Sequence, residues 1–91
     1  MRLQKSKDII IHDESSGCVL LNMENGSFYG VHDLSLEIWK MLDDIFEAEQ
    51  IVVRIAAKFK DIDKEEISND VISFIAELKK EGLIKEYDDN N

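Results

Sequence analysis

Hydrophobic and polar positions follow two different periods along the chain. Up to residue 31, apolar residues come in short β-branched or aromatic runs separated by turn-forming residues, which is typical of strands. From residue 33 onward, apolar residues recur every three or four positions, which is typical of amphipathic helices. The pattern therefore predicts an α+β protein in which a small sheet is followed by helices.

The predicted strands cover Asp8–His12, Cys18–Met23 and Ser27–Val31. Asn25-Gly26 supplies the second turn, because both central residues of a type I′ turn need a positive φ. A two-residue turn at this point would place Leu21 opposite Gly30. We expect an antiparallel three-stranded meander whose last strand lies at an edge of the sheet.

Two helices are predicted directly after the sheet. An apolar stripe of Leu34, Ile38, Met41, Leu42 and Ile45 indicates the first, with Asp33 as its N-cap. The second covers Ala48–Phe59, with Ile51, Val52, Ile55 and Phe59 facing inward.

A third helix is predicted from about Lys64 to Glu81. Asp63 and Glu66 form a capping box at its start, and Gly82 occupies the C′ position of a Schellman motif at its end. The residues after it, 83–87, form either a short final strand or a packed tail. We expect one domain over residues 8–87, a flexible N-terminus over residues 1–7 and a disordered tail over residues 88–91.

Length and charge exclude several classes of function. The chain has 91 residues, with 11 Lys and Arg against 20 Asp and Glu, a net charge of −9. A surface of this sign repels nucleic acid and anionic membranes. The sequence contains neither a secretory signal nor an apolar run long enough to span a bilayer. A single cysteine suits a reducing compartment, so we expect a cytoplasmic protein.

No group of residues indicates catalysis. Cys18, His12 and His32 lack the spacing of a metal site, and the sequence has neither a Gly-rich phosphate loop nor a nucleophile elbow. Cys18 stands in an apolar run and is interpreted as a small buried hydrophobic residue. We therefore predict a protein that is not an enzyme and that uses no cofactor and no metal.

Two features indicate a binding surface, and each has a structural alternative. The apolar arc of the third helix is wider than one buried face requires, so its residues either pack on all sides or line an open groove. The last strand carries neither Pro nor Lys between Ser27 and Val31, so it either accepts a foreign strand or is covered by one end of the chain.

The sequence resembles the PqqD-like family of precursor-recognition elements. The resemblance rests on the segment 17–31 (GCVLLNMENGSFYGV), on Ile38-Trp39 and Leu42-Asp43 in the first helix, and on Glu77-Leu78 and 81–84 (EGLI) at the end. It covers about residues 8–87. Where family members usually have Asn-Glu-x-Gly before the first helix, this chain has residues 32–35 (HDLS).

The resemblance implies a winged helix-turn-helix-like domain, in which a three-stranded antiparallel sheet is followed by three helices. It also implies that the domain binds the leader of a ribosomally made precursor peptide as an extra strand, packed against the third helix. A chain of this length looks most like the free-standing leader-binding protein of lasso-peptide biosynthesis. Its partners would then be the precursor leader and a leader peptidase or another maturation enzyme.

The peptide-binding residues expected on this basis lie on the third strand and on the third helix. Because side chains alternate along a strand, Phe28 and Tyr29 face opposite sides of the sheet, and only one of them can face the helix. Asp70 and Lys79 are expected to supply polar contacts at the rim. The full set is Ser27, Phe28, Tyr29, Gly30, Val31, Asp70, Val71, Phe74, Ile75, Leu78 and Lys79.

Other functions remain as alternatives from the sequence. A winged-helix DNA-binding transcriptional regulator would use the same fold, but its recognition helix would carry more acidic residues than lysines. A small subunit that stabilises a larger enzyme would keep the same groove permanently filled. An open edge strand also allows two copies to form a homodimer by edge pairing.

Overall fold

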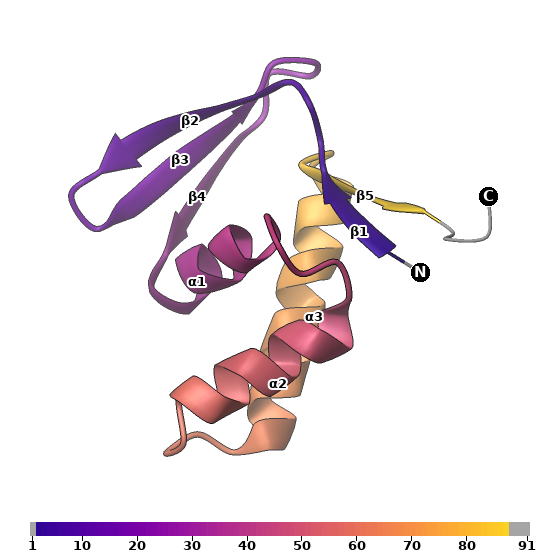
Figure 1. Ribbon diagram of the computed structural model, residues 1–91. Coiled ribbons are helices and arrows are strands. Elements are labelled where there is room, and N and C mark those ends of the chain that lie inside the picture. Colours follow the sequence, from indigo (N-terminus) through magenta and orange to yellow (C-terminus); the bar gives the residue numbers. More distant parts are fainter. Residues whose placement is uncertain (1, 88–91) are drawn as a thin grey trace.

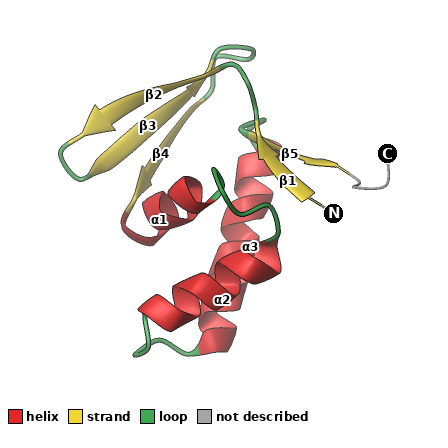
Figure 2. Cartoon of the chain, in the orientation of Figure 1, coloured by secondary structure: helices red, strands yellow, loops and turns green. Residues whose placement is uncertain are grey.

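The computed structural model describes residues 2–87 and confirms the α+β class. Figure 1 shows a small sheet packed over one helix, with two longer helices and a two-stranded ribbon beside it. Figure 2 separates the strands, helices and loops by colour. In chain order the elements are β1 (Arg2–Lys5), β2 (Ile9–Glu14), β3 (Gly17–Asn22), β4 (Phe28–His32), α1 (Asp33–Met41), α2 (Ala48–Lys58), α3 (Lys64–Lys80) and β5 (Ile84–Tyr87).

The main sheet is the predicted meander, with strand order β2-β3-β4 and antiparallel pairing throughout. Its second hairpin differs from the prediction, because Leu21 pairs with Phe28 and not with Gly30. A two-residue turn is therefore wrong for this hairpin. The Asn22 N–H donates to the Ser27 carbonyl at 2.9 Å, and the Gly26 N–H donates to the Asn22 carbonyl at 2.7 Å, which closes a longer loop. The residue of β4 that pairs with Leu21 is two positions earlier than predicted, and side chains alternate with a period of two. Each side chain of β4 therefore stays on its predicted face of the sheet.

The two ends of the described chain pair with each other. Strands β1 and β5 form a separate antiparallel ribbon, which corrects the expectation of a flexible segment over residues 1–7. Leu3 is buried, and its N–H donates to the Phe46 carbonyl at 2.7 Å. The Lys5 ammonium lies 4.0 Å from the centre of the Trp39 ring and 2.7 Å from Asp43. The expected tail over residues 88–91, like Met1, lies outside the described residues.

Helix α1 begins and ends differently from the prediction. Its N-cap is His32, not Asp33, and Asp33 is the first helical residue, with a φ of 52°. The His32 backbone N–H is satisfied by Ser35 Oγ at 3.0 Å, so the Asp33 side chain is not needed as a cap. The helix ends at Met41, and Ile45 is buried from the following turn instead of from the helix.

Helix α3 has the predicted N-cap and the predicted C-terminal motif, but its N-cap bond differs from that of a capping box. Asp63 accepts a hydrogen bond from the Glu65 N–H at 3.2 Å, whereas the predicted capping box would use the Glu66 N–H. At its end, the Leu83 N–H donates to the Leu78 carbonyl at 2.9 Å, which is the defining bond of a Schellman motif. Gly82 has a φ of 73°, a conformation that favours glycine, and it turns the chain directly into β5.

The core lies between the inner face of the sheet and the three helices. Its fully buried members come from every layer: Leu20, Val31, Ile38, Ile51, Ile55, Ile67, Val71, Leu78, Leu83 and Ile84. Gly17 is required where β3 and β4 approach closely, because a Cβ there would lie 2.2 Å from the Val31 carbonyl oxygen. No helix within residues 2–87 has the length and apolar character needed to cross a bilayer.

Candidate functional site: the open edge of strand β4

Strand β4 is an edge strand whose outer side pairs with no other strand within residues 2–87. Asn22 and Ser27 form a hydrogen-bonded pair, and such pairs alternate along an antiparallel ladder. The backbone N–H and C=O groups of Tyr29 and Val31 therefore point toward β3. The backbone N–H and C=O groups of Phe28, Gly30 and His32 point outward. The backbone groups of His32 are already hydrogen-bonded within the chain, because its N–H donates to Ser35 Oγ and its C=O accepts from the same hydroxyl. Phe28 and Gly30 therefore present the backbone groups that an added strand can reach.

The Tyr29 side chain connects this edge to helix α3. Its ring packs on Phe74, with 5.9 Å between the ring centroids, and its hydroxyl donates a hydrogen bond to the Glu77 carboxylate. Burial, together with the bond to Glu77 and the negative charges of Glu77 and Glu81, raises the pKa of the Tyr29 phenol to about 12. Tyr29 is therefore a neutral donor at pH 7, and it forms an apolar floor with a polar rim between strand and helix.

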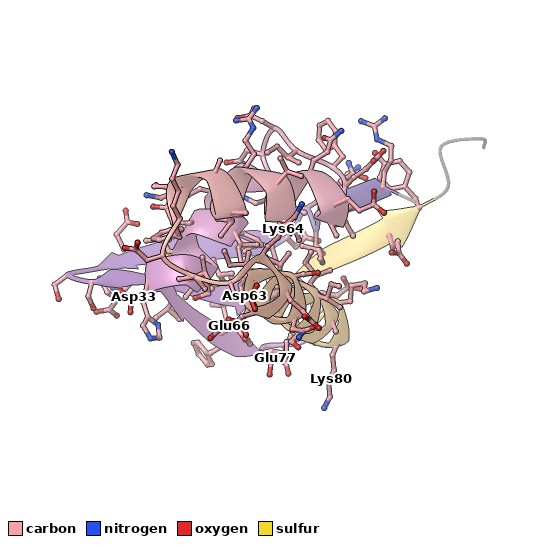
Figure 3. All side chains as sticks on the ribbon, turned by 90° about the horizontal axis from the view of Figure 1, so that it is seen from below. Asp33, Asp63, Lys64, Glu66, Glu77 and Lys80 are labelled. Carbon is pink, nitrogen blue, oxygen red and sulfur yellow. The ribbon has the colours of Figure 1, made fainter. Side chains whose placement is uncertain are left out.

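A stripe of carboxylates runs along α3 beside this floor. At about 100° per residue, Glu66, Asp70, Glu77 and Glu81 fall within an arc of roughly 60°. Figure 3 shows Glu66 and Glu77 on the same side of the helix, with Lys80 near the C-terminal end. Because Tyr29 reaches Glu77, this acidic stripe faces the β4 side of α3. The surface next to the open edge is thus negatively charged.

Two asparagines hold the sheet against the end of α3. Asn22 is buried, and its Nδ2 donates to the Glu81 and Gly82 carbonyls, both at 3.1 Å. Its Oδ1 accepts the Glu24 N–H at 2.9 Å, so the side chain also orders the β3–β4 loop. Asn25 lies farther out and approaches the Glu81 carbonyl at 3.4 Å. These bonds fix the distance between the start of β4 and the C-terminal half of α3.

The comparisons with known proteins identify the family. Residues 17–84 match the family described as coenzyme PQQ synthesis protein D (PqqD), and this segment includes β3, β4, all three helices and the first residue of β5. The chain belongs to the PqqD family. No curated protein matches it in sequence.

Two solved structures share the fold of this PqqD-family chain. One is TbiB1 in complex with the TbiA(beta) leader peptide, with a TM-score of 0.81 and 24% identity over 94% of this chain and 99% of that one. The other is a lasso peptide synthetase B1 complexed with the leader peptide, with a TM-score of 0.78 and 17% identity over 92% and 98% of the two chains. The winged helix-turn-helix-like arrangement expected above is consistent with these similarities.

The predicted helical residues of the PqqD-family chain divide into three groups. Phe74 and Asp70 lie on the β4 side, Phe74 against Tyr29 and Asp70 about 20° around the helix from Glu77. Val71 and Leu78 have no exposed surface and belong to the core, so their side chains do not line an open groove. Ile75 and Lys79 lie on the far side, where they line a hollow with Leu3 of β1, and Lys79 approaches Glu86 at 3.6 Å.

The predicted strand residues also take different roles. Val31 is buried in the core, and Ser27 is held in the loop, where its N–H and hydroxyl both donate to Asn25 Oδ1. Tyr29 is the residue that faces α3. Phe28 is 71% exposed on the opposite face of the sheet, and Gly30 lies on that same face.

Sequence reasoning missed Glu77 and Asn22. The signal for Glu77 was present, because carboxylates at positions 66, 70, 77 and 81 recur at helical spacing on one face. No comparable signal marks Asn22, since its buried partners are backbone carbonyls 59 and 60 residues away in the sequence.

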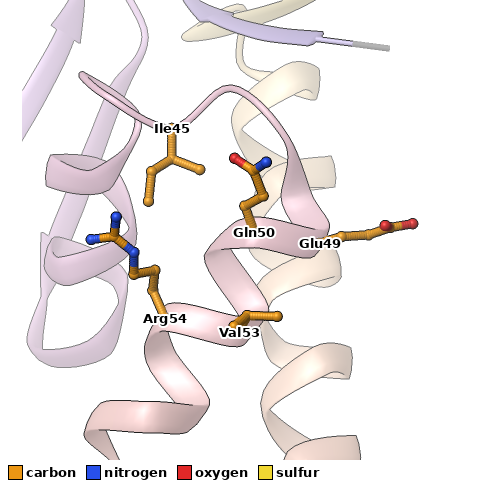
Figure 4. Close-up of a pocket in the computed structure, with 5 residues that line it drawn as sticks. All are labelled: Ile45, Glu49, Gln50, Val53 and Arg54. Atoms are coloured by element: carbon orange, nitrogen blue, oxygen red, sulfur yellow. The ribbon is translucent and has the colours of Figure 1, made fainter.

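A further hollow lies beside helix α2. A hollow of about 460 Å³ between the turn before α2 and α2 itself is lined by Ile45 and by residues 49, 50, 53 and 54. In Figure 4 the Glu49 side chain points away from Arg54 and Gln50, so these polar groups do not converge on one point. Across residues 2–87 no three His, Cys, Asp or Glu side chains gather as a metal site requires. Cys18 is buried as predicted, and burial raises the pKa of its thiol.

Proposed function

We propose that this chain binds the leader segment of a ribosomally made precursor peptide and presents the precursor to a maturation enzyme such as a leader peptidase. The leader adds as a fourth strand on β4 and packs its inward-facing side chains on α3. The observation that carries the proposal is the unpaired edge at Phe28 and Gly30, which lies directly beside the Tyr29–Phe74 floor. The role is one of binding, and the chain itself performs no chemistry.

Within residues 2–87, neither end of the chain covers this edge. From the sequence, either terminus was an alternative cover for β4, but β1 and β5 pair with each other instead. Natural edge strands are usually protected by Pro, Lys or a covering segment, and none of these protects Phe28–His32 within the described residues. Strand addition is the recognition mode that such an edge supports.

Fold similarity adds support from outside the chain. Both similar structures named above are complexes of their proteins with leader peptides. The correspondence extends over more than nine-tenths of each chain, so the β4–α3 region of this chain has a counterpart in those folds.

Charge defines the kind of leader that this surface favours. The acidic stripe on α3 and the net charge of −9 favour a leader with Lys or Arg at the positions that face the helix. Residues on one face of the leader recur about every 6.6 Å, and the carboxylates within each of the pairs Glu66/Asp70 and Glu77/Glu81 are about 6 Å apart along α3. Each pair can therefore face two successive basic side chains on that face of the leader. Because these charges are exposed, affinity should fall when NaCl is raised from about 50 to about 500 mM.

The test uses a displayed library of random twelve-residue peptides selected on the wild-type protein. The enriched peptides are then labelled with fluorescein and titrated by fluorescence anisotropy. Four backbone hydrogen bonds and two or three buried side chains, less the cost of ordering the peptide, predict dissociation constants in the micromolar range or below.

Position 30 offers a matched pair of variants. Gly30→Pro removes an outward N–H without touching the bonds to β3, so we expect at least a tenfold loss of affinity. Gly30→Ala keeps that N–H, and its Cβ meets no atom within 4 Å, so binding should stay within about threefold. Equal binding by Gly30→Pro and wild type, with the fold of both verified by circular dichroism, would rule out strand addition on β4.

A further inference from the structure

Strand β2 forms a second open edge of the main sheet. The strand order is β2-β3-β4, so the outer side of β2 pairs with no other strand of the described chain. The Met23 N–H donates to the Asp8 carbonyl at 2.8 Å, which makes these two residues a hydrogen-bonded pair of the ladder. Alternation from this pair leaves the backbone N–H and C=O groups of Ile9, Ile11 and Asp13 pointing outward.

The helices leave both faces of β2 exposed. Helix α1 packs against β3 and β4, and Figure 1 shows β2 along the opposite border of the sheet. Ile10 on the outer face is 50% exposed, and Ile11 on the inner face is 52% exposed. Natural edges are usually protected by Pro, Lys or a covering segment, and the run Ile9–Ile11 has none of these within the described residues. A second strand could therefore add here as well.

The edge of β2 is complementary to itself in one antiparallel register. When Ile10 lies on a two-fold axis, opposite Ile10 of a second copy, Ile9 stands opposite Ile11 in both halves. Outward backbone groups then meet outward backbone groups, and the two pairs of Ile9 with Ile11 supply four hydrogen bonds. Each isoleucine also contacts an isoleucine of the other copy on its own face of the sheet. A shift of one residue would place outward groups opposite groups that already bond to β3.

Charges at the two ends of β2 favour the same register. Lys7 then stands opposite Asp13 of the second copy, and symmetry produces this contact twice. Both side chains are exposed, and neither forms a salt bridge within the described residues. Although Lys7 lies outside β2, its flexible side chain can reach the carboxylate. A shift of two residues would instead place Ile9 opposite Asp13 and Asp8 opposite Glu14, which are mismatched pairs.

We propose that two copies of this chain form a homodimer by antiparallel pairing of their β2 edges, with Ile10 on the two-fold axis. The strand order of the joined sheet is β4-β3-β2-β2-β3-β4, so both β4 edges stay free at its ends. The interface is an isologous one that uses only six strand residues of each copy, so it belongs to the small, transient class. The dimer does not depend on the proposed function, and it would present two peptide-binding edges if that function holds.

Sedimentation velocity of the full chain without peptide tests the dimer. We expect monomers at about 10 μM protein and a clear dimer fraction at about 500 μM. Lys7→Glu and Asp13→Lys each convert both attractive contacts into repulsive ones, so each should weaken dimerisation at least about fivefold. Asp13→Lys also changes the net charge from −9 to −7, so general repulsion between copies would change dimerisation in the opposite direction.

Two matched samples restore the contacts without restoring the wild-type sequence. The double variant Lys7→Glu/Asp13→Lys exchanges the two charges, so it should dimerise within about threefold of wild type. An equimolar mixture of the two single variants should form a mixed dimer, because Glu at 7 then faces Lys at 13 and the wild-type Lys7 faces the wild-type Asp13. Both positions are exposed, and circular dichroism verifies that every variant folds.

The outcomes distinguish this dimer from the proposed function. Wild type that stays monomeric at about 500 μM refutes the dimer and leaves peptide binding at β4 untouched. Asp13→Lys that dimerises as well as wild type, or a mixture no better than its single variants, refutes the β2 pairing. Gly30→Pro should dimerise like wild type even though it loses peptide binding. If Gly30→Pro instead lowers the dimer fraction, the copies pair through β4 and the proposed β2 interface is wrong.

Discussion

Asn22 makes the most direct test of how the sheet is held on α3. Its side chain is 3% exposed and makes three hydrogen bonds to backbone groups, two of them to the carbonyls that end α3. Asn22→Ala removes all three, which leaves the Glu81 carbonyl with only the long contact from Asn25 and the Gly82 carbonyl with its bond from Ser6 Oγ. We expect the free energy of unfolding to fall by about 2–3 kcal/mol, since each such bond is worth about 0.5–1.5 kcal/mol.

A loss of this size is large for the molecule. At about 0.05–0.15 kcal/mol per residue, a chain of this length has a total stability of about 5–13 kcal/mol. The midpoint of thermal unfolding should therefore drop by about 10–20 °C. Urea unfolding monitored through Trp39 gives the free energy directly, because Trp39 is the single tryptophan and is buried.

Asn25→Ala is the matched control for this prediction. Asn25 accepts two hydrogen bonds from Ser27 and approaches the Glu81 carbonyl at 3.4 Å, but all three contacts are exposed. Because water can replace these partners, the variant should lose less than about 1 kcal/mol. If Asn22→Ala unfolds at the same urea concentration as Asn25→Ala, Asn22 does not hold the sheet on the helix as argued.

Four further predictions concern single residues outside the Asn22 contact. The pKa of Tyr29, raised to about 12, favours the neutral phenol in the folded state, so wild-type stability should fall as the pH rises from about 10 to 12. Tyr29→Phe should show less of this fall in urea melts across that range. Gly17→Ala should destabilise the fold by about 1–3 kcal/mol, because its Cβ would overlap the Val31 carbonyl oxygen. Leu3→Ala should cost about 2–5 kcal/mol, measured in urea, if β1 is part of the core as described. Cys18 should react with iodoacetamide in native protein far more slowly than in urea, as mass spectrometry can measure.

The order and type of the main elements could be predicted because local signals agree with burial. The period-2 runs and the helical stripes point to faces that are buried in the structure, and Gly82 after α3 takes the positive φ that a Schellman motif requires. Strand β1 escaped prediction because its sequence offers one apolar residue, Leu3, among polar and basic neighbours. Its stability comes from tertiary contacts, such as those of Lys5 with Trp39 and Asp43.

The candidate site could be predicted only in part. Tyr29, Phe74 and Asp70 were predicted from the sequence and lie together on the β4 side of α3. An apolar arc does not reveal which of its members other elements cover, and in the structure Val71 and Leu78 are fully covered. At about 100° per residue, Lys79 lies on the side of α3 away from Glu77, where it approaches Glu86.

The pairing of β1 with β5 has a consequence for protein engineering. Arg2 stands opposite Tyr87, so the first and last described residues leave the domain at one place, on a ribbon separate from the sheet that contains β4. A tether attached at either terminus therefore starts away from the edge where a substrate strand would dock. Genetic fusion to a modifying enzyme, at either end, should therefore leave the β4 edge accessible, so that a peptide bound there lies close to that enzyme.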